Sequence, residues 1–132
     1  MKEPILLVDD DEEICEEMSE ILTHEGYLVS TAFDGEEALK MIDSHPFKLV
    51  IMDIKMPKIN GFDALKRIKN DFPSMKVLLV SGRPFIKHFL PGEESARKEK
   101  NSKVLDMADG FINKPFDIPL VLKTIHSLVY VE

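Results

Sequence analysis

The chain has 132 residues and a formal net charge of -7 at pH 7, which suits one domain that buries a core without disulfides or a structural metal. The acidic balance argues against non-specific nucleic-acid binding. A single cysteine excludes an intramolecular disulfide, and no early apolar stretch has the length of a signal peptide or a membrane span. We therefore expect a single domain over residues 1–132 in the cytoplasm, without direct nucleic-acid binding or membrane contact.

Short apolar runs alternate with helical patterns along the chain, which is typical of βαβ units and a parallel sheet. In chain order the predicted elements are a strand over 4–9, a helix around 14–22, a strand over 27–32, a helix around 35–42, a strand over 47–53, a helix over 61–72, a strand over 75–81, a strand over 110–113 and a final helix with apolar positions from 118 to 129. Gly26 is placed to end the first helix, and Asp34 with Glu37 is typical of a helix N-terminus. Asn60 is a candidate cap for the third helix.

Polar side chains follow four of the five predicted strands. Asp9 and Asp10 close the first run, Asp53 the third and Ser81 the fourth, and Lys114 follows the fifth. The second strand ends in uncharged residues, which fits a doubly wound sheet of order 2-1-3-4-5 with its switch point between strands one and three. The carboxyl ends of parallel strands share one edge of the sheet, so we expect these five side chains to lie close together.

This set of residue types suits phosphoryl chemistry with a divalent cation. An aspartate can attack phosphorus and hold an aspartyl-phosphate, a reaction that depends on positioning and charge neutralisation. Mg²⁺ takes a few carboxylate ligands and keeps water and phosphate oxygens. A lysine ammonium and a serine hydroxyl can contact the remaining phosphoryl oxygens. The sequence therefore predicts a phosphoryl and magnesium site at this edge.

The connection between the fourth and fifth strands is long. Ser81 and Lys114 are 114 − 81 = 33 positions apart, and residues 83–103 carry six Lys or Arg and three Glu, a formal +3. We expect an insertion at about 83–103, whose charged part could begin a helix at Glu93. Its apolar residues, at 85–86 and 89–90, either dock the insertion onto the domain or form a contact surface.

The motifs, taken in order, resemble the receiver domain of two-component response regulators, the CheY-like members of the flavodoxin-like α/β folds. The resemblance runs from residue 4 to about 130. It is carried by Leu7-Val8-Asp9-Asp10, Asp34-Gly35, Met52-Asp53-Ile54-Lys55-Met56-Pro57 with Asn60-Gly61, Val80-Ser81-Gly82, and Phe111-Ile112-Asn113-Lys114-Pro115-Phe116. Three departures are the insertion, Met107, which stands where a glycine often precedes Ala108-Asp109, and Phe111, which stands where the family often has tyrosine.

The resemblance implies that Asp53 accepts a phosphoryl group from a histidine kinase or a phosphotransfer protein. Magnesium would bind Asp10, Asp53 and the backbone carbonyl of Lys55, with Asp9 acting largely through water. Ser81 and Phe111 would form the switch pair that changes the surface near strand four, helix four, strand five and the final helix. The domain would be a phosphoacceptor switch that assists its own phosphorylation and dephosphorylation, not an enzyme on other substrates, and phosphorylation could drive dimer formation. The resemblance does not name the output partner.

Two other functions remain open at this point. A magnesium-dependent phosphatase similar to the haloacid-dehalogenase group would use an aspartate nucleophile with a second aspartate two positions on, which Asp9 and Asp11 superficially fit. A constitutive interaction module without phosphorylation is the other alternative. The complete set of Asp10, Asp53, Ser81 and Lys114 argues against it.

Overall fold

A computed structural model describes residues 3–54, 61–81, 106–114 and 116–130 of the chain. Five parallel strands form one sheet in the order β2-β1-β3-β4-β5, which confirms the predicted topology. The strands are β1 (Pro4–Val8), β2 (Leu28–Ala32), β3 (Leu49–Asp53), β4 (Lys76–Ser81) and β5 (Gly110–Asn113). The helices are α1 (Glu12–His24), α2 (Gly35–Ser44), α3 (Gly61–Asp71) and α5 (Ile118–Val129). The predicted insertion at 83–103 and the Asn60 cap lie outside the described residues.

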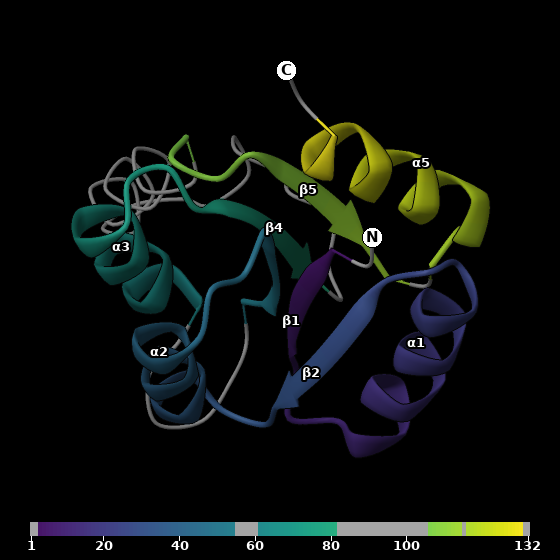
Figure 1. Cartoon of the computed structure of the whole chain (residues 1–132), viewed down its shortest axis with the longest axis horizontal. Coiled ribbons are helices and arrows are strands. Elements are labelled where there is room, and N and C mark those ends of the chain that lie inside the picture. The colour runs from purple at the N-terminus through teal and green to yellow at the C-terminus, as the bar shows by residue number, and fades with distance from the viewer. Residues whose placement is uncertain (1–2, 55–60, 82–105, 115, 131–132) are drawn as a thin grey trace, which may run out of the picture.

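Helices cover both faces of the sheet, with α1 and α5 on one side and α2 and α3 on the other (Figure 1). Side chains alternate along the central strands between the two cores. In β1, Ile5 and Leu7 face the α1 and α5 side, while Leu6 and Val8 face the α2 and α3 side. Every residue of β3 is buried, as expected of a parallel strand covered on both faces. None of the described helices is both long and apolar enough to span a membrane.

Local signals set the ends of the helices. Gly26 has φ 97°, a left-handed conformation that glycine adopts without a steric penalty, and it follows α1 as predicted. At the start of α2, Asp34 Oδ1 accepts from the backbone N–H of Glu37 at 2.8 Å, and Glu37 Oε2 accepts from the N–H of Phe33 at 3.4 Å. This reciprocal arrangement confirms the predicted cap. Gly26 therefore marks the end of α1, and Asp34 with Glu37 marks the start of α2.

Candidate functional site

The strand register brings the predicted polar residues to one edge of the sheet. Asp9 directly follows β1, whose last residue Val8 pairs with Met52, and Asp53 ends β3. Ser81 ends β4 and pairs with Asn113 of β5. The backbone N–H of Lys114 then donates to the carbonyl oxygen of Ser81 at 2.7 Å. The carboxyl edge at the switch point, where open α/β sheets bind ligands, thus carries this group.

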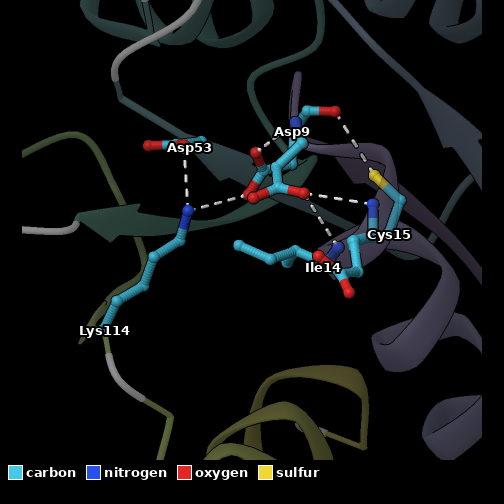
Figure 2. Close-up of polar contacts among 7 residues, drawn as sticks. Asp9, Ile14, Cys15, Asp53 and Lys114 are labelled. Atoms are coloured by element: carbon cyan, nitrogen blue, oxygen red, sulfur yellow. Dashed lines mark hydrogen bonds and ion pairs between the residues drawn. The ribbon is translucent and has the colours of Figure 1, made fainter.

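Lys114 joins two buried carboxylates. Its Nζ lies 3.0 Å from Asp9 Oδ2 and 3.1 Å from Asp53 Oδ2 (Figure 2). Asp9 is 3% exposed and Asp53 is 6% exposed. Burial lowers the pKa of the Lys114 ammonium, but its hydrogen bonds to Asp9 and Asp53 outweigh burial and raise this pKa above its ordinary value. The site therefore holds a fixed positive charge between two carboxylates at neutral pH.

Asp9 is held in place by backbone contacts as well as by Lys114. Its Oδ1 accepts from the N–H of Asp11 at 3.0 Å, and its backbone oxygen accepts from the thiol of Cys15 at 3.3 Å (Figure 2). Burial, then the negative charge of Asp9, raises the pKa of the Cys15 thiol to about 11. The thiol thus stays protonated and able to donate at neutral pH. Cys15 is buried in the core, where a free cysteine behaves as a small apolar residue.

Three carboxylates lie close enough to share a metal ion. One ligand oxygen each from Asp9, Asp10 and Asp53 lies within 4.8 Å of the other two, and Asp10 is the exposed member. With Lys114 beside them, the four side chains carry a formal charge of −3 + 1 = −2. Hard oxygen ligands with this net charge suit a divalent cation such as Mg²⁺. The donor set therefore fits the predicted ion, and Asp10 is the carboxylate of this set that is exposed to solvent.

Asp11 has a different role from the one that a phosphatase would require. Its Oδ1 accepts from the N–H groups of Glu13 and Ile14, and it is the N-cap of α1. A carboxylate used as a helix cap is turned toward the first turn of α1. Among the described residues, the three carboxylates that lie close enough to share a metal are Asp9, Asp10 and Asp53, whereas Asp11 is used as the helix cap.

Ser81 and Phe111, the proposed switch pair, lie on neighbouring strands. Ser81 ends β4, while Phe111 is in β5, paired with Leu79. Phe111 is 43% exposed, whereas its neighbour Ile112 is buried in the core with α1 and α5. The Phe111 ring therefore lies on the opposite side of β5 from that core. Lys55, the predicted source of a carbonyl ligand, lies outside the described residues.

Two structural contacts near the sheet could not be predicted from the sequence. Asp109 Oδ2 accepts from Lys69 Nζ and from the N–H of Val77, each at 2.8 Å, at the amino end of β4. Gly61 begins α3 and lies directly against the backbone of residues 53 and 54. Asp109 carries no local motif. In the sequence, Asn60-Gly61 predicted only a helix start, and the contact of Gly61 with residues 53 and 54 follows only from the tertiary structure.

Comparison with known proteins agrees with this geometry. The sequence model of the family described as the response regulator receiver domain matches residues 5–126. The chain belongs to this family. Its curated relatives include the response regulator GtcR of Aneurinibacillus migulanus, 35% identical over 120 residues that make up 89% of this chain and 43% of that protein. Response regulator RR06 of Streptococcus pneumoniae is 37% identical over 128 residues, 95% of this chain and 52% of that protein. The receiver domain thus spans about half the length of these curated relatives.

Solved structures of receiver domains match over nearly their whole length. The response regulator TrrA of Thermotoga maritima, solved in complex with Mg²⁺ and BeF, is 33% identical, with a TM-score of 0.78 covering 97% of this chain and 99% of that one. A CheY-like receiver domain of Methanospirillum hungatei is 30% identical, with a TM-score of 0.82 covering 98% and 94%. These matches confirm the CheY-like fold and the resemblance drawn from the motifs.

Proposed function

We propose that this receiver domain is a phosphoacceptor switch in which Asp53 takes a phosphoryl group from a histidine kinase or a phosphotransfer protein. The observation that carries this proposal is the Lys114 bridge between Asp9 and Asp53, next to Asp10. Asp53 ends a fully buried strand, so its carboxylate has a fixed position. Phosphoryl transfer depends mainly on such positioning and on neutralising charge.

In the proposed reaction, an oxygen of the Asp53 carboxylate forms a bond to phosphorus while the bond from phosphorus to the donor's imidazole nitrogen breaks. The electron pair leaves with the imidazole, which takes a proton from solvent. Asp9, Asp10 and Asp53, with the backbone carbonyl of Lys55, would hold Mg²⁺, which neutralises phosphoryl oxygens when bound. Lys114 would turn its ammonium from the carboxylates toward a phosphoryl oxygen.

The response to phosphorylation would pass through Ser81 and Phe111. The Ser81 hydroxyl would bind a phosphoryl oxygen, and the exposed Phe111 ring would follow it inward and reshape the surface near β4, β5 and α5. A dimer formed on phosphorylation fits this surface change. The single domain over 1–132, the cytoplasmic location and the absence of activity on other substrates stay predictions from the sequence.

The test is phosphorylation by acetyl phosphate with Mg²⁺, followed by mass spectrometry of the intact chain. Wild type should gain one phosphoryl group, and Asp53→Asn should gain none. Asp10→Asn should bind Mg²⁺ more weakly in a titration, because one of few protein ligands is lost. Label at wild-type level in Asp53→Asn would refute the assignment. Sustained turnover of p-nitrophenyl phosphate would favour the phosphatase instead.

A further inference from the structure

Gly61 lies directly against the backbone of Asp53 and Ile54. A Cβ atom placed on Gly61 would lie 2.5 Å from Ile54 Cα, 2.8 Å from the Asp53 backbone oxygen and 3.0 Å from the Ile54 oxygen. The Gly61 N–H donates to that Ile54 oxygen at 2.7 Å. These three nearest atoms all belong to the backbone, so no side-chain rotation could move them away. Close approach of two backbones is a position for which glycine is suited.

The surroundings leave few ways to relieve a clash at this point. On the other side of the contact, the Ile54 N–H donates to the Val80 oxygen at 3.0 Å, so β4 restrains residue 54. α3 is also restrained, because Ala64, Leu65 and Ile68 are each 0% exposed in the core between α3 and the sheet. Retreat of α3 would open this core, and close-packed interiors resist such gaps. A side chain at residue 61 would therefore displace the Asp53–Ile54 backbone.

From this contact we propose that Gly61 is a positioning residue for Asp53. It fixes the backbone of residues 53 and 54 by its hydrogen bond and its lack of a side chain, and so sets where the Asp53 carboxylate lies relative to Asp9, Asp10 and Lys114. The part of this inference that concerns phosphoryl transfer rests on the proposed function. The part that concerns the position of the Asp53 carboxylate relative to Asp9, Asp10 and Lys114 depends only on the observed geometry. A displacement of about 1 Å at a reacting group can cost about 100-fold in rate.

The experiment compares Gly61→Ala with two control variants that make the same substitution elsewhere. Gly26→Ala introduces backbone strain at φ 97°, with nothing within 4 Å of the added atom, and should lower the Tm by roughly 4 °C. At Gly110, at the start of β5, the three atoms nearest to an added Cβ all belong to side chains, of which Leu78 Cδ1 is nearest at 3.0 Å. Both controls change a glycine away from the carboxylates, so they separate general destabilisation from displacement of Asp53.

Two measurements decide the role of Gly61: Mg²⁺ affinity by titration calorimetry and the initial rate of labelling by acetyl phosphate. We expect Gly61→Ala to bind Mg²⁺ roughly tenfold more weakly and to label about 100-fold more slowly, with both controls within about twofold of wild type. A Gly61→Ala protein that matches Gly26→Ala in both measurements would overturn the proposal. If wild type takes no label, the proposed function fails, and the Mg²⁺ comparison still decides the role of Gly61.

A measurement on wild type covers the case in which Gly61→Ala does not fold. The Gly61 amide should be protected from hydrogen exchange by its bond to Ile54. Its NMR signal should also shift when Mg²⁺ is added, because the backbone that it contacts carries a metal-binding carboxylate. A Gly61 amide that exchanges as fast as those of exposed residues and does not respond to Mg²⁺ would show that Gly61 does not position Asp53.

Discussion

Replacement of Lys114 by methionine, which has a similar length and no charge, tests the charge balance of the site most directly. Lys114→Met would leave Asp9 and Asp53 buried without the ammonium that bridges them. At 3.0 and 3.1 Å, each pair gains about 5 kcal/mol of Coulomb attraction at an effective dielectric constant of about 20. Desolvation offsets much of this attraction, and loss of one partner of a buried ion pair typically costs about 3–5 kcal/mol.

The expected result is a large loss of stability in the absence of divalent metal. For a domain of this size, 3–5 kcal/mol corresponds to a fall in Tm of about 12–20 °C. The raised pKa of Lys114 means that its contribution is fully present at pH 7 and is lost only as pH rises through that raised value. Urea unfolding at pH 7 in EDTA is therefore the appropriate assay.

Magnesium should reverse part of this loss. Lys114→Met removes a cation from the site, so Mg²⁺ should bind at least as tightly as in wild type and stabilise the variant by about 2.7 kcal/mol at 100 times its Kd. A Lys114→Met, Asp53→Asn double variant should be more stable than Lys114→Met alone, because one of the two buried carboxylates that lose the ammonium is replaced by a neutral amide. Equal free energies of unfolding for wild type and Lys114→Met in EDTA would refute this account of the site.

Two further predictions concern residues outside the proposed chemistry. Asp109→Ala should cost about 3 kcal/mol of stability, because it removes the acceptor of the Val77 N–H and the ion pair with Lys69, which keeps the Met75 oxygen as an acceptor. Asp109→Asn keeps an oxygen for the Val77 N–H and should cost about 1 kcal/mol; urea unfolding measures both, and equal losses would contradict the contribution of the Val77 hydrogen bond. The pKa of Cys15, raised to about 11, implies stability that is present below pH 9 and falls by about 3 kcal/mol in total as pH rises through 11. Cys15→Ala should lack this pH-dependent fall, and identical pH slopes for the two proteins would contradict it.

The sequence by itself determined which elements form and which residues end them. Alternating apolar runs and helical spacing predicted the five described strands and their order, because residue type and period act over a few positions. The left-handed Gly26 and the Asp34 and Glu37 cap were predicted for the same local reason. The absence of a charged residue at the end of β2 then indicated that the strand order reverses between β1 and β3. The matching family, confirmed by comparison, follows from these motifs.

Only the tertiary structure decided how the side chains of the site meet. Lys114 and Asp9 are 105 positions apart, and no local pattern specifies that one ammonium lies between Asp9 and Asp53. The thiol bond from Cys15 to the backbone of Asp9 and the contact of Gly61 with residues 53 and 54 depend on how α1 and α3 pack on the sheet. Such contacts come from close packing of elements distant in sequence, where a shift of about 1 Å changes the chemistry.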